Sequence, residues 1–90
     1  MQLILADIPF GRNIQKIRLE KNMTQTKTVE KMQLMGSYMS RSTLGHIENG
    51  RRNIKVNDLR LLKMIFNVSY DAFFECADSS VNNINNISLQ

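Results

Sequence analysis

Residues 40–52 read Ser40-Arg41-Ser42-Thr43-Leu44-Gly45-His46-Ile47-Glu48-Asn49-Gly50-Arg51-Arg52, and this segment decides the fold. Its first residue is a favourable helix N-cap, because a serine hydroxyl can accept a hydrogen bond from a first-turn amide. The Asn-Gly pair near its end is typical of a helix C-terminus, where glycine adopts the left-handed conformation without strain. Met39 before the cap and Leu44 inside the helix are spaced as a hydrophobic staple. The segment therefore predicts a short helix over 41–49, with two arginines directly behind it.

Two helices are predicted before this segment. In the first, over 9–22, Phe10, Ile14 and Ile17 recur at the spacing of an amphipathic helix. Its Pro9 suits a first helical turn, where the missing N–H is no loss. The second helix, over 25–35, begins after the N-cap residue Thr24, ends before Gly36, and has Val29 and Met32 on its inner face.

Two further helices are predicted after the segment. The helix over 57–66 has an apolar inner face, made of Leu59, Leu62, Ile65 and Phe66. Ser69 is the expected cap of a short fifth helix over 70–75, and Val68 with Phe73 has staple spacing. Five short helices with brief connections and no strand pattern predict an all-α domain.

The chain divides into three parts on composition. A segment over 1–8 precedes the helical domain of 9–76, and an Asn- and Ser-rich tail covers 77–90. Three apolar residues in the tail recur at three-residue spacing: Val81, Ile84 and Ile87. Two interpretations stay open for this part, a poorly ordered tail or a short helix that docks on a partner subunit.

Basic residues are concentrated in the middle of the chain. All twelve Lys and Arg lie within 12–63, together with four acidic residues, so this part carries +8 while the whole chain carries +4. A basic centre with acidic flanks is a plausible footprint for a polyanion. The alternative is a set of lysine-rich helix faces that are merely solvated.

Nothing in the sequence indicates catalysis, export or a bound cofactor. The apolar start has no basic flank and contains Asp7 and Pro9, so it does not resemble a signal peptide, and no stretch is long enough to span a membrane. The single Cys76 and single His46 give no metal-binding cluster and no catalytic motif. We expect a cytoplasmic protein that is not an enzyme and has no metal, cofactor or small-molecule ligand. The six methionines are expected to fill the core, Met35 and Met64 included.

Several separated motifs resemble those of the Cro/C1-type, or XRE, helix-turn-helix family of DNA-binding regulators. They are Thr24-Gln25, Ser40-Arg41-Ser42-Thr43-Leu44, Ile47-Glu48-Asn49-Gly50-Arg51-Arg52 and Asn67-Val68-Ser69-Tyr70-Asp71. The resemblance covers 10–74 and implies a lambda-repressor-like fold of five helices. Two departures stand out. The turn before the third helix is about five residues longer than in the standard pattern, as in a subgroup of the family, and Thr28 replaces the usual Leu, which predicts looser packing of the second helix.

The resemblance also assigns roles to individual residues. It implies contacts to DNA base edges by Arg41, Ser42, Gly45 and His46, contacts to DNA phosphates by Thr24, Gln25, Thr43, Asn49, Arg51 and Arg52, and a structural ion pair between Arg18 and Glu48. Arginine in the first turn of a recognition helix can bind guanine through two hydrogen bonds, which agrees with the role of Arg41. For His46 the alternative is a solvated surface histidine.

The function expected from this resemblance is sequence-specific binding of double-stranded DNA by a small transcriptional regulator. A repressor that acts as a homodimer is favoured, because one module reads only a few base pairs. The dimer surface is expected in the C-terminal third, around 66–87, because apolar residues are dense there. The alternative is a protein-interaction module on the same fold, such as an antitoxin or adaptor, which fold alone does not exclude.

Overall fold

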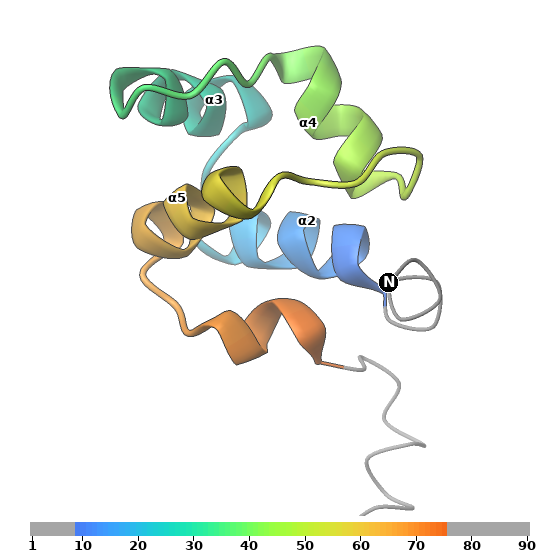
Figure 1. Cartoon of the computed structure of the whole chain (residues 1–90). Coiled ribbons are helices and arrows are strands. Elements are labelled where there is room, and N and C mark those ends of the chain that lie inside the picture. Colours follow the sequence, from blue (N-terminus) through green and yellow to red (C-terminus); the bar gives the residue numbers. More distant parts are fainter. Residues whose placement is uncertain (1–8, 76–90) are drawn as a thin grey trace, which may run out of the picture.

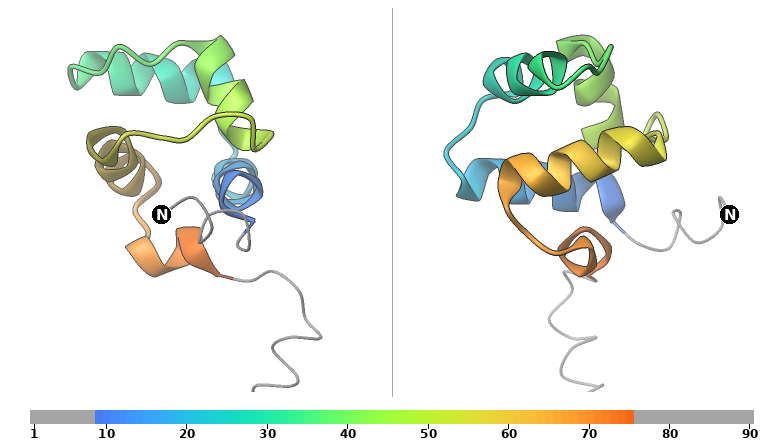
Figure 2. Two further views of the ribbon diagram at one scale, coloured as in Figure 1. Left: turned by 45° about the vertical axis from the view of Figure 1, so that its right-hand side comes forward. Right: turned by 60° about the vertical axis from the view of Figure 1, so that its left-hand side comes forward.

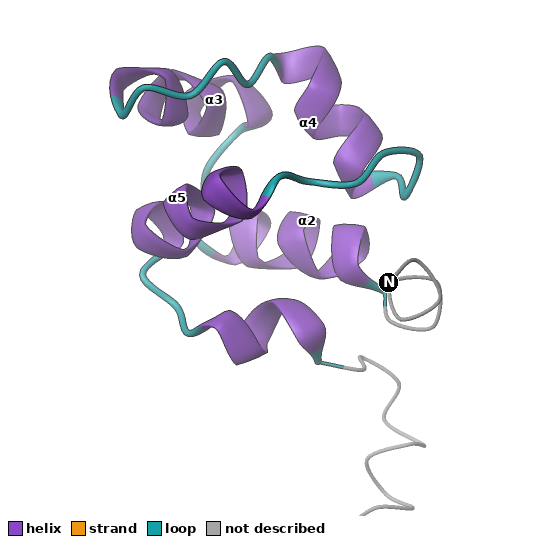
Figure 3. Ribbon diagram, viewed as in Figure 1, coloured by secondary structure: helices purple, strands orange, loops and turns teal. Residues whose placement is uncertain are grey.

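The computed structural model describes residues 9–75, and this part of the chain is entirely helical apart from turns and loops (Figure 3). Its elements in chain order are α2 (Phe10–Glu20), α3 (Gln25–Leu34), α4 (Arg41–Glu48), α5 (Val56–Phe66) and the 3-10 helix η1 (Tyr70–Phe74). The prediction of an all-α fold is confirmed for the described residues. The four predicted helices over 9–22, 25–35, 41–49 and 57–66 correspond to α2–α5, with ends that differ by one or two residues.

The predicted fifth α-helix over 70–75 is wrong, because these residues form the single 3-10 helix η1. Ser69 precedes η1 but makes no side-chain capping bond. Instead its carbonyl accepts from the amide of Ala72 at 3.2 Å, the i to i+3 bond of a tight turn. A five-residue segment is too short to repay helix nucleation, so burial of Phe73 has to hold η1 in place.

The elements form layers (Figures 1 and 2). α3 and α4 lie together on one side of α2 and α5, and η1 lies on the other side. α2 contacts both α4 and η1, while α3 contacts α4 and α5. One face of α4 is therefore packed on the domain, and the other is left at the surface.

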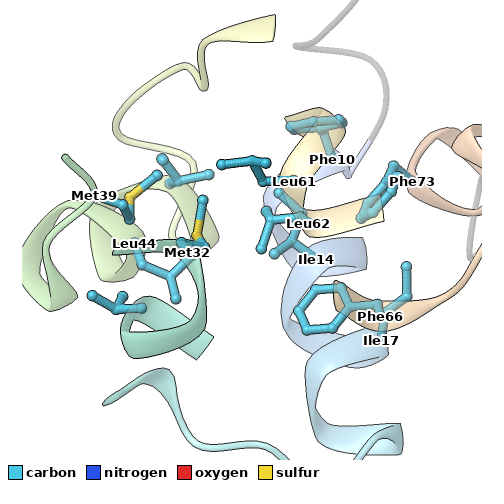
Figure 4. Packing of buried hydrophobic residues seen from close by; sticks show 12 residues of the cluster. Phe10, Ile14, Ile17, Met32, Met39, Leu44, Leu61, Leu62, Phe66 and Phe73 are labelled. Atoms are coloured by element: carbon cyan, nitrogen blue, oxygen red, sulfur yellow. The ribbon is translucent and has the colours of Figure 1, made fainter. Parts of the chain in front are cut away.

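The core runs between these layers (Figure 4). Its buried side chains are Phe10, Ile14, Ile17, Val29, Met32, Met39, Leu44, Ile47, Leu61, Leu62, Phe66 and Phe73. Most were expected inside, whereas Leu61 was not and is buried in α5, and Leu59 and Ile65 are only partly buried. Two methionines are exposed and do not lie in the core. Met35, at the C-terminal end of α3, is 39% exposed, and Met64, on the outer side of α5, is 52% exposed.

Thr28 does not weaken the packing of α3 in the way the sequence suggested. Its side chain is fully buried, and its hydroxyl donates to the carbonyl of Thr24 at 2.9 Å. The same hydroxyl lies 3.9 Å from the sulfur of Met23. A buried hydroxyl with a good acceptor carries little desolvation penalty, so threonine can replace an apolar residue here.

A buried amide fastens η1 to α2. Asn13 Nδ2 donates to the carbonyls of Phe73 at 2.9 Å and Glu75 at 2.7 Å. These two carbonyls lie at the end of η1, a short 3-10 helix that has few backbone hydrogen bonds of its own. Asn13 therefore satisfies backbone groups that would otherwise lack partners near the core.

At Gly11, α2 passes very close to the end of α4. A Cβ at this position would lie 2.1 Å from the carbonyl oxygen of Ile47 and 2.9 Å from that of Glu48. Both atoms belong to backbone, which cannot rotate away as a side chain can. The absent side chain at Gly11 thus sets how near α4 lies to α2.

We expect Gly11→Ala to destabilise the domain by about 1–3 kcal/mol, the usual cost of overpacking, or more if the helices separate. Gly45→Ala is the matched control, because a Cβ there meets only Gln25 Nε2 at 3.8 Å. It should raise stability by up to about 1 kcal/mol through helix propensity. Urea denaturation of both variants measures the free energies of unfolding. Equal stability of Gly11→Ala and the parent chain would contradict the close crossing.

Candidate nucleic-acid interface

Both ends of α4 are closed by local hydrogen bonds. At its start, Ser40 Oγ accepts from the amide of Thr43 at 3.1 Å and donates to Thr43 Oγ1 at 2.9 Å. At its end, Gly50 has a φ of 79°. The amide of Arg51 then donates back to the carbonyl of His46 at 2.8 Å. This bond is the mark of a Schellman motif, so the basic residues that follow leave α4 in a defined direction.

The outer face of α4 carries the residues that were assigned to base contacts. Leu44, Ile47 and Glu48 are buried against the domain. The remaining side gathers the four candidates, of which Arg41, Ser42 and His46 are exposed and Gly45 is partly exposed. Their spacing, i, i+1, i+4 and i+5, places them along one stripe of the helix. α4 therefore presents a narrow polar face with a cation at its N-terminal end.

Arg18 and Glu48 lie within an ion pair that joins α2 to α4. Arg18 Nε is 2.7 Å from Glu48 Oε2, and Nη2 is 3.1 Å from Oε1, so the two groups meet through two parallel bonds. Both side chains are buried, with 8% and 1% of their surface exposed. A third bond runs from Arg18 Nη1 to the carbonyl of Met23 at 2.8 Å. Glu48 therefore faces the interior, away from the outer stripe.

Gln25 also reaches this pair. Its Nε2 donates to Glu48 Oε1 at 2.9 Å, which ties the first residue of α3 to the last turn of α4. The side chain is thus engaged inside the protein, where the sequence predicted a phosphate contact. The remaining groups for such a contact are the second N–H of its Nε2 amide and the backbone amides of the first turn, which have no carbonyl partner within the helix.

The other phosphate candidates lie at both ends of the helix pair. Thr24 is exposed and caps α3 by accepting from the amide of Lys27 at 3.0 Å. Asn49, Arg51 and Arg52 are exposed in the loop behind α4. The candidates therefore border the outer face of α4 on two sides, as anchoring to both DNA backbones would require.

Three residues beside this face were not singled out from the sequence. Tyr38, Lys55 and Asn57 line a depression together with Thr43 and Arg52. Lys55 could have been found from its place two residues before the predicted helix over 57–66, because phosphates often bind at a helix start. Tyr38 gave a weaker signal, an aromatic residue in a turn of unusual length.

Other kinds of site find little support in the described part of the chain. No group of three or more His, Cys, Asp or Glu side chains within 9–75 could hold a metal ion. None of the helices in this range is long and apolar enough to cross a membrane. Cys76 and the tail over 77–90, together with 1–8, lie outside the described residues.

We expect Glu48→Gln to destabilise the fold, because it leaves the buried Arg18 guanidinium without its counter-charge. Loss of one partner of a buried pair costs about 3–5 kcal/mol, and the bond to Met23 offsets part of this. Thermal and urea denaturation measure the loss. Glu30→Gln, an exposed glutamate on α3, is the control and should change stability little. An unchanged melting temperature with an altered DNA preference would instead make Glu48 a base reader.

The comparisons with known proteins agree with this arrangement. A family model described as "Helix-turn-helix" matches residues 14–73, two thirds of the chain, from the first turns of α2 to η1. Neither the curated proteins nor the solved structures gave a significant match. The matched range contains the capped α3 and α4 and the buried pair between α2 and α4. The chain therefore belongs to the Cro/C1-type, or XRE, family of DNA-binding helix-turn-helix regulators.

Proposed function

We propose that the protein is a sequence-specific regulator of transcription, a repressor that places α4 in the major groove of double-stranded DNA. The observation that carries this proposal is the outer stripe of α4, bordered on both sides by groups suited to phosphate. The stripe is polar, narrow and held rigidly by buried contacts on the opposite face. Repression needs no more than occupancy of a promoter site, so a small domain suffices for it.

Arg41 is the residue best suited to read a base. It lies in the first turn of α4, the end that recognition helices direct at base edges, and it is exposed. Its guanidinium can donate two hydrogen bonds to O6 and N7 of guanine. Ser42 and His46 lie on the same stripe and are the further proposed readers, while Gly45 permits close approach of the helix to the bases.

Thr24, Gln25, Thr43, Asn49, Arg51 and Arg52 are proposed to contact phosphates and so to fix the position of α4 along the groove. Arg51 and Arg52 follow the Gly50 stop and extend from a loop, not from the stripe. The hydroxyl of Thr43 accepts from Ser40, which leaves its own proton free to donate. Contacts of this kind carry affinity and little sequence information.

We expect the loss of Arg41 and the losses of Arg51 and Arg52 to have different signatures. Arg41→Ala should cost about 1–3 kcal/mol on the cognate site and far less on random duplex. Arg51→Ala and Arg52→Ala should weaken binding to both duplexes alike. Each lost phosphate contact should also reduce the slope of log K against log salt concentration by about one unit. Titrations of the three variants on both duplexes at several salt concentrations measure this, after selection of the cognate site from a random pool.

Two outcomes would contradict the proposal. Equal losses on both duplexes for Arg41→Ala would make it a phosphate contact and leave Ser42 and His46 as the readers. Negligible binding of the parent chain to any duplex at low salt would favour a protein-interaction module instead, because a DNA regulator retains salt-dependent non-specific binding.

We further propose that the protein binds as a homodimer on a two-fold site. Exposed apolar side chains lie at α5 and η1, namely Met64, Tyr70 and Phe74 with 52%, 42% and 38% of their surface exposed. η1 lies on the side of the domain opposite α3 and α4 (Figure 1), so a dimer formed there leaves the outer face of α4 free. Burial of these side chains would supply the driving force for association.

We expect Met64→Glu to weaken the dimer, because the carboxylate would be buried in the proposed interface. The side chain is exposed in the single domain, so folding should be unaffected. Leu34→Glu is the control, since Leu34 is 87% exposed on α3 and should change the oligomeric state little. Sedimentation velocity over a range of concentrations measures both. A parent chain that stays monomeric throughout, or a Met64→Glu variant with unchanged association, would remove this surface from the interface.

A further inference from the structure

The turn between α3 and α4 displays an aromatic side chain that the core does not use. Tyr38 is fully exposed, while its neighbours Ser37 and Met39 are buried at 9% and 4%. Full exposure of a tyrosine leaves its apolar ring in water, so the domain gives up the free energy that burial of the ring would contribute. The alternation suggests that the turn is arranged to present this one residue.

Hydrogen bonds fix the turn on either side of Tyr38. Ser37 Oγ donates to Asp58 Oδ1 at 2.8 Å and accepts from the amide of Met39 at 2.9 Å. The carbonyl of Met39 in turn accepts from Gln33 Nε2 at 2.9 Å. The backbone at Tyr38 is therefore anchored to α3 and to the first turn of α5. Little ordering entropy remains to be lost when this backbone meets a ligand.

Tyr38 borders a depression between the turn and the start of α5. Thr43, Arg52, Lys55, Asn57 and Asp58 line it too. In Figure 1 the turn runs into the N-terminal end of α4, while the segment that leads into α5 runs back from the C-terminal end of α4. Thr43, in the first turn of α4, lines the depression together with both of them. The depression therefore adjoins the proposed base-reading stripe.

The lining favours an anion. Neither Arg52 nor Lys55 is paired with a carboxylate of the described residues. The one acidic group, Asp58, already accepts from Ser37 and lies in the first turn of α5, where the helix dipole compensates its charge. Two unpaired cations, two side chains with hydrogen-bond donors and one phenol thus converge on a single shallow surface.

We propose that this depression binds the sugar–phosphate backbone of DNA beside the bases read by α4, with Tyr38 and Lys55 as phosphate contacts added to Arg52 and Thr43. The inference rests on the proposed function and extends its DNA footprint to the long turn. The phenol of Tyr38 donates one hydrogen bond to a phosphate oxygen, and Lys55 supplies charge. Tyrosine and lysine side chains commonly serve DNA phosphates in this way.

Tyr38→Phe and Lys55→Gln separate the two contributions. Tyr38→Phe removes only a neutral donor, so it should weaken cognate and random duplex alike by about three- to tenfold, the worth of one net hydrogen bond, with an unchanged salt slope. Lys55→Gln should weaken both duplexes and also flatten the salt slope by about one unit, because one fewer counterion is released. Binding is measured with the full chain by fluorescence anisotropy at several salt concentrations.

One control matches the lysine. Lys16→Gln removes the charge of an exposed side chain on α2 that belongs neither to the depression nor to the proposed dimer surface. It should leave the affinity and the salt slope nearly unchanged. Melting temperatures of Tyr38→Phe and Lys55→Gln should equal that of the parent chain, because both side chains are exposed.

The possible failures are distinguishable. Parent-like binding by Tyr38→Phe and Lys55→Gln, with losses for Arg51→Ala and Arg41→Ala, would overturn this inference and leave the proposed function standing. A Tyr38→Phe loss confined to the cognate duplex would make Tyr38 a base reader and also overturn it. Absence of salt-dependent binding by the parent chain would instead remove the proposed function itself.

Discussion

The buried pair of Arg18 and Glu48 is the contact on which the recognition surface depends. A charge taken out of water is costly unless a partner and further hydrogen bonds replace its hydration. Glu48 receives three bonds, two from Arg18 on α2 and one from Gln25 on α3. Because any separation of the three helices would strand these charges, their relative orientation is restricted to the one in which all bonds are formed. The orientation of the outer stripe is fixed as well, because the stripe is one face of α4.

Backbone packing at Gly11 adds a second constraint to the same turn of α4. Gly11 lies two helical turns before Arg18 on α2, and it meets the carbonyls of Ile47 and Glu48 directly. The ion pair therefore holds α4 through the side chain of Glu48, while Gly11 holds it through the backbone carbonyls of Ile47 and Glu48. With two such points along α2, α4 can neither slide nor rotate without steric overlap or a broken pair. Rigid support of this kind makes a short helix usable for reading bases, since contacts need placement to within a fraction of an ångström.

Much of this arrangement follows from local sequence patterns, and the exceptions have identifiable physical causes. The caps Thr24 and Ser40 and the stop at Gly50 bond only to residues within one turn, so the sequence alone predicts them. Burial is different, because it depends on partners far along the chain, which is why Leu61 was missed and Met64 was placed in the core. The positions of Ser69, Val68 and Phe73 favour an α-helix for this segment, but Ser69 makes no capping bond and five residues are too few to repay helix nucleation. The bond from Gln25 to Glu48 spans 23 residues and could not be derived from spacing.

The long turn before α4 is compatible with DNA reading because the position of α4 does not depend on it. α4 is held by α2 through Gly11 and Arg18, and it begins at its own cap, Ser40. Extra residues within 33–39 therefore leave the register of the reading stripe unchanged, and lengthening a surface loop costs little chain entropy. The bond between Ser37 and Asp58 then fastens the added length to α5. In a helix pair held together only by its turn, such an insertion would change the relative position of the two helices. In this domain the added residues instead provide additional surface next to α4.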